Sequence, residues 1–396
     1  MSTEREVVVL SGVRTAIGDY GGALKDMPPS ELAATVIREA VKRAKIDPKD
    51  VGQLVLGNVI HTEAKDMYIS RVVAVNGGLP HGSGAFTVNR LCGSGMQAIV
   101  SAAQTILLGD TDAAIGGGTE SMSRAAYANL TQRWGARMGD NKTVDMMVGA
   151  LTDPFDTIHM GITAENVANK CGITREQQDA FAVESHRRAV AARNAGHFKD
   201  QILPIELKSK KGPTHFDTDE HMREDASVEG MAKLKAVFAK ENGTVTAGNA
   251  SGINDAAAAV VLMEAGVAGK KGLKPMARLV SYGHAGLDPK IMGLGPVSAV
   301  KSALTKAGLK IADIDVIESN EAFAAQALGV SKELGLDPAK VNPNGGAVAL
   351  GHPIGATGAI LTIKCMNELH RTNKRYGLIT MCIGGGQGIA AVIERL

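Results

Sequence analysis

Two cysteines of this chain lie beside glycines, in positions where a thiol could react with a substrate. Cys92 belongs to the segment LCGSG at residues 91–95, and Cys382 belongs to MCIGGG at residues 381–386. Glycine has no Cβ, so a substrate can approach a thiol that glycines flank. A thiolate is a strong nucleophile, and a helix N-terminus or a neighbouring imidazole increases its reactivity. The two segments therefore indicate covalent chemistry that uses either one sulfur or two.

Cys92 is predicted to lie where a strand passes into a helix. Residues 86–89 are typical of a strand, and residues 95–103 are typical of a helix. The thiol would then lie near free backbone N–H groups and the positive end of the helix dipole, which favour a thiolate. The alternative is a buried cysteine with a structural role only.

Residues 93–98 also fit a second class of enzyme. The string GSGMQA has the form G-x-G-x-x-A after a predicted strand, and Glu120 follows the next predicted strand. This is the outline of a dinucleotide-binding fingerprint, in which the acid binds a ribose. That interpretation would place a cysteine where the pyrophosphate must pack, and it leaves the second half of the chain unexplained. An NAD(P)-dependent enzyme is the competing hypothesis.

One histidine lies among five glycines in residues 344–358, NGGAVALGHPIGATG. Pro353 suits the first position of a helix, which would put His352 at the helix entrance. A cysteine and a histidine in contact would make a nucleophile with its base. The alternative is a histidine that caps a phosphate-binding loop.

Asn320 and Cys382 each follow or end a predicted strand. Asn320 begins NEAFA and comes just after the strand at residues 316–317, so it could position a water or donate to an oxyanion. An asparagine-initiated turn is the alternative. Cys382 could act as an acid or a base, and the N–H of Gly384 and its neighbours could form an oxyanion hole. A buried strand cysteine without a role is the alternative there.

Short apolar runs alternate with helical patterns, which predicts an α/β layered fold. Ser30 is the expected N-cap of the first helix. We expect strands at residues 7–10, 54–56, 113–115, 316–317 and 378–383, and helices at residues 31–44 and 297–307.

The two halves of the chain also resemble one another. Residues 40–51 match residues 303–314 without a gap, and AIGGG at 114–118 resembles CIGGG at 382–386. Each half is therefore expected to end a strand in three glycines. The match places His352 at the position of Cys92, and a pseudo-twofold axis would bring the two helix entrances together. Two unrelated α/β segments are the alternative.

The composition is that of an ordinary globular enzyme. The chain has 396 residues, 44% hydrophobic and 21% charged, and a net charge of +2, too small to indicate nucleic-acid binding. Its four cysteines show no Cys-x-x-Cys spacing, so we expect no metal site but reduced thiols in a cytoplasmic protein. A polar N-terminus that runs into a strand, and no apolar run of transmembrane length, predict neither a signal peptide nor a membrane partner.

Three regions are predicted. Residues 1–118 form an N-terminal half that about residues 246–270 complete, and residues 271–396 form the C-terminal half. Residues 119–245 are rich in charged and aromatic side chains and form an inserted loop domain. Such loops over the end of a sheet commonly bind substrates.

The four segments together resemble the thiolase family, in its order and near its spacing, from about residue 7 to residue 393. The chain is most similar to bacterial acetyl-CoA acetyltransferases and broad-range β-ketothiolases. The resemblance implies an α/β fold of two pseudo-symmetric βαβαβαββ halves in a five-layer α-β-α-β-α arrangement, with an inserted loop domain, usually as a homotetramer.

The resemblance also implies a role for each reactive residue. Cys92 would take the acyl group from an acyl-CoA, and His352 would activate it and supply part of one oxyanion hole. Asn320 would hold a water that completes this hole. Cys382 would remove a proton from the methyl group of a second acetyl-CoA. The N–H groups of Cys92 and Gly384 would form a second oxyanion hole.

The implied activity is the reversible Claisen condensation of two acetyl-CoA to acetoacetyl-CoA and CoA, or thiolysis of a 3-ketoacyl-CoA, with ping-pong kinetics. A broad-range β-ketothiolase of polyhydroxyalkanoate synthesis or fatty-acid degradation is the alternative. No tightly bound cofactor is expected beyond coenzyme A thioesters, and Met292 would shape the acyl pocket. The residues expected to bind coenzyme A are Leu151, His159, Met160, Arg223, Phe238, Ala250, Ser251, Ala322 and Phe323.

Overall fold

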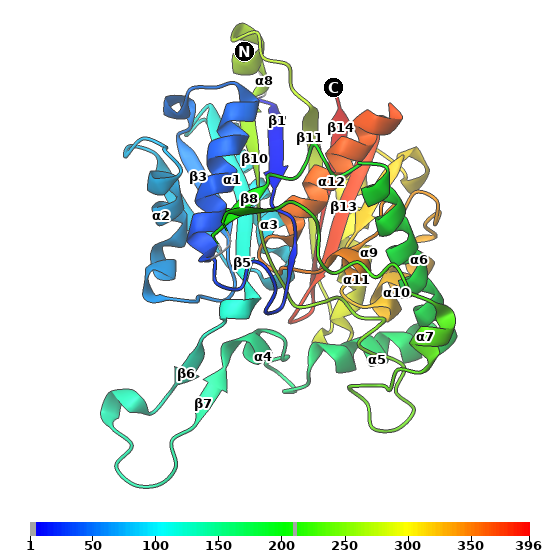
Figure 1. Ribbon diagram of the computed structural model, residues 1–396. Helices are drawn as coiled ribbons and strands as arrows, with labels where there is room; N and C mark the ends of the chain where they lie inside the picture. The colour runs from blue at the N-terminus through cyan, green and yellow to red at the C-terminus, as the bar shows by residue number, and fades with distance from the viewer. Residues whose placement is uncertain (1–4, 209–211) are drawn as a thin grey trace.

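The computed structural model describes residues 5–208 and 212–396 and confirms the α/β class (Figure 1). Within these residues, ten strands form one sheet, and two further pairs of short strands lie apart from it. The first half of the chain contains β1 (Val7–Arg14), β2 (Gly18–Asp19), α1 (Pro29–Ala44), β3 (Gln53–Gly57), α2 (Ile69–Asn76), β4 (Gly84–Val88), α3 (Ser94–Leu107), β5 (Ala113–Ser121), and later β10 (Asn254–Glu264) and α8 (Ala265–Lys270).

The second half repeats this order of strands and helices, except that one strand is reduced to a single bridge. The parallel bridge between Ile317 and Val341 takes the place that β4 holds in the first half. The second half contains β11 (Ala277–Gly286), α9 (Gly295–Ala307), β12 (Val316–Ser319), α10 (Ala324–Leu334), α11 (Ala347–Leu350), α12 (Thr357–Thr372), β13 (Tyr376–Ile383) and β14 (Gln387–Arg395).

Most of the region between β5 and β10 lies beside and below the sheet in Figure 1, and its β8 (Ile205–Leu207) crosses in front of the sheet. It contains β6 (Tyr127–Asn129), β7 (Thr143–Asp145), α4 (Met146–Ala150), α5 (Met160–Cys171), α6 (Arg175–Asn194), β8, β9 (Thr214–Phe216) and α7 (Val228–Ala232). The exact boundaries of the three predicted regions stay a prediction.

The strand order is β12-β13-β14-β11-β1-β10-β5-β3-β4, and β2 pairs with β10. The two halves meet at β1 and β11, where only Val8 and Val9 pair, with Arg278 and Ala277. The sheet is thus two half-sheets with a narrow junction, which lets each half bury its own faces.

Five layers result, because helices cover both outer faces and two helices fill the middle. In β1, Ser11 contacts α1 while Gly12 faces Ile363 of α12. In the other half-sheet, Ser281 of β11 contacts α9, while Gly377 of β13 faces α12. Helices α3 and α12 pack on each other between the half-sheets (Figure 1).

Side chains at equivalent places support the predicted repeat. Ser11 Oγ donates to Ala40 O at 2.7 Å, and Ser281 Oγ donates to Ala303 O at 2.7 Å. The antiparallel register shifts just before Ser11 and again just before Ser281. The predicted match of residues 40–51 with 303–314 therefore has a counterpart in the packing.

The predicted match of the two glycine triplets is wrong. Residues 116–118 lie inside β5, whereas residues 384–386 form the turn between β13 and β14. Leu54 pairs with Ile115 in one half and Ile317 pairs with Leu378 in the other, so Ile115 corresponds to Leu378. The triplet in β5 serves close packing, because a Cβ on any of its glycines would overlap backbone atoms.

Two predicted helix starts also differ. The N-cap of α1 is Pro28, and Ser30 lies inside the helix with an unpaired hydroxyl. Helix α12 begins at Thr357, because Pro353 O accepts hydrogen bonds from Ala356 N and Thr357 N in a separate turn before it. His352 thus precedes its helix by five residues and Cys92 precedes α3 by two, so they are not equivalent positions.

Gly118→Ala is expected to destabilise the fold by about 1–3 kcal/mol, because the added Cβ would overlap the carbonyl oxygen of Gly355 in the backbone next to α12. Urea unfolding measures this loss. Gly269→Ala in α8 is the matched control, since its Cβ would meet no atom within 4 Å. Equal stability of the two variants would contradict this packing.

None of the helices in residues 5–208 and 212–396 is long and apolar enough to span a membrane.

Candidate active site

Cys92 lies in a single 3-10 turn, Leu91–Gly93, just before α3. Leu91 has a φ of 45°, a left-handed conformation that is uncommon for a side chain of this size. The turn is fixed locally, because Leu91 N donates to Asn89 Oδ1 at 3.1 Å and Leu91 O accepts from Ser94 Oγ at 2.7 Å. Strained backbone held in this way is frequent at functional sites.

Burial controls the acidity of the Cys92 thiol. Desolvation raises its pKa from 9.0 to about 11, although the N–H groups of Gly384 and Cys92 itself hydrogen-bond the sulfur and act in the opposite direction. The buried carboxyl of Glu120 raises the pKa further. The helix entrance therefore does not produce the thiolate that its sequence context predicts, and the thiol needs a base.

His352 can supply this base. Its Nδ1 lies 2.7 Å from Thr357 Oγ1, and that hydroxyl donates to Pro353 O at 3.0 Å. We therefore assign the ring proton to Nδ1, which makes Nε2 the acceptor of the ring. Burial lowers the pKa of His352 from 6.5 to about 4, so the imidazole is neutral near pH 7.

Asn320 follows β12 directly and faces the same imidazole. Its Nδ2 lies 3.3 Å from His352 Nε2, and its backbone N–H donates to Thr380 O at 2.9 Å. Asn320 Oδ1 is buried and accepts no hydrogen bond from any described residue. Such an atom can bind the hydrogen of a water or a ligand.

Cys382 is fully buried in β13, one residue before its end. Burial raises the pKa of this thiol well above its usual value, and the Cys92 sulfur raises it further, so the two sulfurs interact electrostatically. Gly384, whose N–H contacts the Cys92 sulfur, opens the turn that follows β13. The predicted catalytic residues thus meet around one point, from the ends of β12 and β13 and the turns before α3 and α12.

A cavity of about 400 Å³ opens onto these groups, and both Cys92 and His352 line it. Part of its wall gave no signal in the sequence, since the apolar side chains of Met122, Val237 and Ile253 belong to none of the four segments with reactive residues. Most residues predicted to bind coenzyme A or shape the acyl pocket line it too: Leu151, His159, Met160, Phe238, Ala250, Ser251, Met292, Ala322 and Phe323.

One wall of this cavity is aromatic. The His159 ring stacks on Phe238, with centroids 4.7 Å apart, and Phe238 meets Phe323 edge-on at 6.2 Å. His159 also caps α5, because its Nδ1 accepts from Gly161 N at 3.0 Å. Burial lowers the pKa of His159, so the wall presents a neutral, apolar surface suited to a thioester chain.

Arg223 lies outside this cavity, in a neighbouring one of about 370 Å³. His186 and His221 line the same second cavity, and Ala247 lines both. We call this second space the cationic cavity. Its cation is Arg223, because burial lowers the pKa of His186 to about 4, and the carboxylate of Asp225 also lines it. Next to the first, apolar cavity, this arginine suits an anionic group at the far end of a long ligand.

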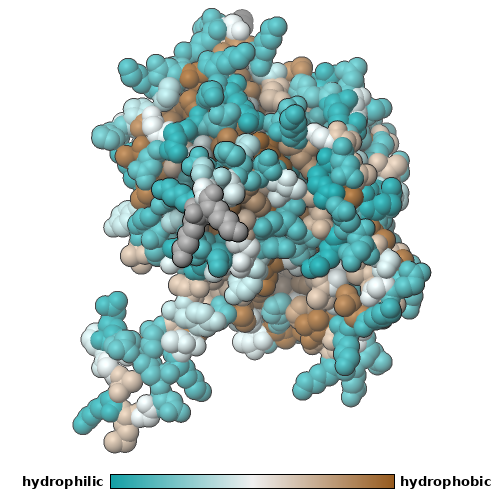
Figure 2. All heavy atoms as spheres, viewed as in Figure 1, coloured by the Kyte–Doolittle hydropathy of each residue, from teal (hydrophilic) through white to brown (hydrophobic). Residues whose placement is uncertain are grey.

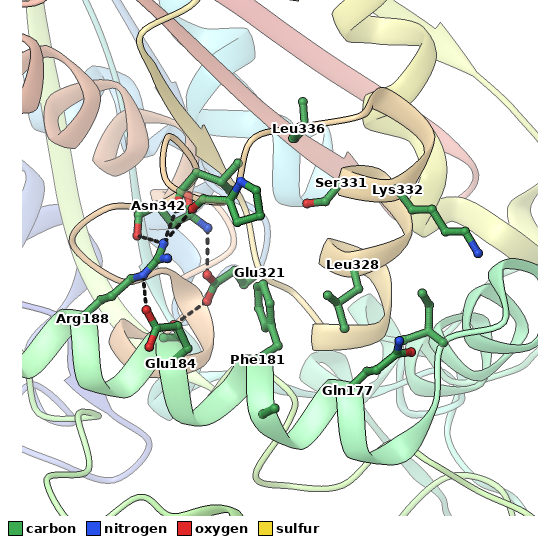
Figure 3. Close-up of a pocket in the computed structure, with 15 residues that line it drawn as sticks. Gln177, Phe181, Glu184, Arg188, Glu321, Leu328, Ser331, Lys332, Leu336 and Asn342 are labelled. Atoms are coloured by element: carbon green, nitrogen blue, oxygen red, sulfur yellow. Dashed lines mark hydrogen bonds and ion pairs between the residues drawn. The ribbon is translucent and has the colours of Figure 1, made fainter.

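A third cavity, of about 550 Å³, lies between α6 and α10, and none of the predicted site residues lines it (Figure 3). Glu321 stands on its wall, where it accepts from Ser185 Oγ at 2.7 Å and from Asn342 Nδ2 at 2.8 Å. Glu321 follows Asn320 in the chain, so these hydrogen bonds fix the residue beside Asn320, while none of the reactive side chains lines this cavity.

Family models match almost the whole chain: "Thiolase, N-terminal domain" covers residues 7–266, and "Thiolase, C-terminal domain" covers residues 273–395. The chain belongs to the thiolase family. It is 68% identical to beta-ketothiolase BktB of Cupriavidus necator over 99% of this chain and 100% of that protein. It is 50% identical to an acetyl-CoA acetyltransferase of Chromobacterium violaceum over 98% of this chain and 100% of that one.

Solved thiolase structures confirm the predicted fold. The crystal structure of Bacillus anthracis acetyl-CoA acetyltransferase superposes with a TM-score of 0.97 at 46% identity and full coverage of both chains (100% and 100%). Human mitochondrial 3-ketoacyl-CoA thiolase superposes with a TM-score of 0.97 at 44% identity over 99% of each chain. The chain is therefore an acyltransferase with the thiolase fold.

The competing dinucleotide interpretation does not fit this thiolase. Glu120 is fully buried, and its carboxyl accepts hydrogen bonds from the N–H groups of Val59, Ile60 and Gly355 at 3.1, 3.0 and 2.9 Å. The side chain is thus engaged inside the protein and is not free to bind a ribose. It ties the turn that precedes α12 to the loop after β3.

The pH dependence of alkylation tests the environment of Cys92. Because burial raises the thiol pKa to about 11, the thiolate fraction should increase roughly tenfold per pH unit from pH 6 to 9. The rate of Cys92 modification by iodoacetamide, followed by peptide mass spectrometry, should increase accordingly. A rate that levels off below pH 8 would contradict the raised pKa.

Proposed function

We propose that this thiolase condenses two acetyl-CoA to acetoacetyl-CoA and CoA, and catalyses the reverse thiolysis, through an acyl-Cys92 intermediate. The observation that carries the proposal is the meeting of the Cys92 thiol with a neutral His352 at one cavity, with Cys382 and the Gly384 N–H beside the same sulfur. A nucleophile, its base, a second acid/base group and oxyanion donors are the parts that this reaction needs.

In the first half-reaction, His352 Nε2 takes the proton of the Cys92 thiol as the sulfur attacks the thioester carbonyl. The bond between that carbonyl and the CoA sulfur then breaks, and CoA leaves as a thiolate. His352 keeps the proton of Cys92, and the departed CoA thiolate takes the proton of the Cys382 thiol. The N–H groups of Cys92 and Gly384 would receive the carbonyl oxygen, because both already point at the Cys92 sulfur.

In the second half-reaction, the Cys382 thiolate removes a proton from the methyl group of a second acetyl-CoA. The raised pKa of Cys382 supports this role, because a stronger base abstracts a weakly acidic proton more readily. The protonated His352 and a water on Asn320 would hold the enolate oxygen. The carbanion attacks the acyl carbon and the bond to Cys92 breaks. The Cys92 thiolate then takes the proton back from His352, and acetoacetyl-CoA leaves.

Coenzyme A would extend from this point through both cavities. The pantetheine arm would lie along the stacked His159 and Phe238 and reach Ser251, and Arg223 in the cationic cavity would receive the nucleotide end. We expect no other tightly bound cofactor.

A second candidate is a wider acyl range, with 3-ketovaleryl-CoA and longer substrates, in polyhydroxyalkanoate synthesis or fatty-acid degradation. The 68% identity to a protein named beta-ketothiolase favours it, and Met292 and Ile354 give the cavity flexible apolar walls. Thiolysis of a series of 3-ketoacyl-CoA substrates of increasing length, compared by kcat/KM, tests both candidates. A sharp fall after the four-carbon substrate would support the narrow range.

We also propose that the chain works as a cytoplasmic homotetramer. The β6–β7 hairpin projects from the body in Figures 1 and 2 and exposes Leu130, Trp134 and Met138, the last two at 88% and 97%. Exposed apolar side chains of this size typically mark a contact with another protein. Sedimentation of the wild type and of a Trp134→Ser, Met138→Ser variant tests this, since only the variant should lose the tetramer.

A further inference from the structure

A two-residue strand connects the catalytic histidine to a distant surface. In β2, Gly18 and Asp19 pair with Asp255 and Asn254 of β10. The Asn254 side chain is fully buried, and its Nδ2 donates to Gly18 O at 3.1 Å and to Asp19 Oδ1 at 3.2 Å. Its Oδ1 accepts from the backbone N–H of His352 at 2.9 Å.

The position of Asn254 is tightly specified. Gly351, the residue before His352, has a φ of 104°, and a Cβ there would lie 2.5 Å from the Asn254 side chain. The glycine therefore makes room for the amide that holds the next residue. A shift of Asn254 would move the backbone of the catalytic histidine.

Asp19 is held from the other side by His221. His221 Nδ1 lies 2.6 Å from Asp19 Oδ1, the same oxygen that accepts from Asn254. This hydrogen bond is the main cause that lowers the pKa of Asp19, with the charge of Arg223 as a further cause. The Asp19 carboxylate thus lies between the side-chain amide of Asn254 and the basic side chains of His221 and Arg223.

His221 in turn lines the cationic cavity. Arg223 and His186 lie beside it, and the rings of His186 and His221 are 6.5 Å apart. His186 Nδ1 accepts from Arg223 N at 3.1 Å, which fixes this wall. Hydrogen bonds therefore run without a break from the wall of the cationic cavity to the backbone of His352.

We propose that Asp19 and His221 are positioning residues for the catalytic histidine, acting through Asn254. The inference rests on the proposed function, in which His352 takes the proton of Cys92. Neither residue reaches the reacting atoms. Their contribution is the placement of Nε2, and a small displacement of a base costs rate more than binding.

The test is the rate of Cys92 acetylation at saturation, by rapid quench and mass spectrometry, with two thioesters. Acetyl-CoA carries the nucleotide, and acetyl-pantetheine lacks it. We expect Asp19→Ala and His221→Leu each to lower the maximal rate about tenfold with both thioesters, because the defect lies at the reacting end. Arg223→Gln should instead raise only the acetyl-CoA concentration needed for half-saturation.

Two further variants separate positioning from a general loss of structure. The double variant Asp19→Ala, His221→Leu should be no slower than either single variant, since both break one chain of contacts. His221→Asn should recover most of the rate, because its side-chain amide can donate from nearly the position of Nδ1. Asp50→Asn, which alters the exposed ion pair with Lys271, is the control and should keep the wild-type rate.

Three results would overturn the inference: an effect confined to the half-saturating concentration of acetyl-CoA, multiplicative loss in the double variant, or no rescue by His221→Asn in a variant with wild-type thermal stability. Wild-type chain that takes up no acetyl group would instead refute the proposed function. The two failures are therefore distinguishable.

Discussion

Cys382→Ser is expected to accept an acetyl group on Cys92 at nearly the wild-type rate and to lose condensation by about a thousandfold. The serine hydroxyl is too weak an acid to form the anion that would have to take the methyl proton. Cys382 is fully buried and the substitution removes little volume, so the fold should persist. Single-turnover acetylation and steady-state synthesis of acetoacetyl-CoA measure the two steps separately.

Cys171→Ser is the matched control for this variant. Cys171 is a free, buried thiol at the end of α5 and does not line the apolar cavity. It should keep both steps. If Cys382→Ser lost acetylation together with condensation, Cys382 would be a structural residue, and the proposed roles of Cys92 as nucleophile and Cys382 as base would be wrong.

His352→Asn is expected to slow the acetylation of Cys92 between about a hundredfold and ten-thousandfold at pH 7, the usual contribution of a general base. The Cys92 thiol is protonated there because its pKa is raised to about 11, so removing the base leaves almost no thiolate. In the wild type, the His352 pKa of about 4 means that the imidazole stays neutral from pH 7 down to pH 5.

The rate of wild-type acetylation should therefore show no loss around pH 6.5, where an ordinary histidine would become protonated. In His352→Asn the rate should rise with pH as hydroxide replaces the missing base. Stopped-flow release of CoA over pH 5 to 9 gives both profiles. An equal pH profile in the variant and the wild type would exclude His352 as the base.

Much of the site could be predicted from sequence, because Cys92, His352 and Cys382 stand in glycine-rich segments and Asn320 directly follows a strand. The repeat predicted that distant segments meet, although Cys92 and His352 are not equivalent positions in it. The helix starts were less predictable. Ser30 is a residue type that commonly caps helices, but α1 begins earlier, with Pro28 as its N-cap. A turn at residues 353–356 separates His352 from α12.

The pKa of the Cys92 thiol could not be predicted from local sequence patterns. The helix entrance favours the thiolate, but desolvation has the larger effect and raises the pKa, and it depends on how both halves of the chain pack. The hydrogen bonds from His221 through Asp19 and Asn254 to His352 could not be predicted either. Their partners lie 202, 235 and 98 residues apart in the sequence, so no local motif contains them. Such contacts become apparent only when β2 pairs with β10.

The most direct test of the account is the mass of the Cys92 peptide after brief exposure of the protein to acetyl-CoA. We expect one added acetyl group on Cys92, which disappears when CoA is added and does not form in Cys92→Ser. An acetyl group on another residue, or none on any cysteine while acetoacetyl-CoA is produced, would contradict the acyl-Cys92 mechanism.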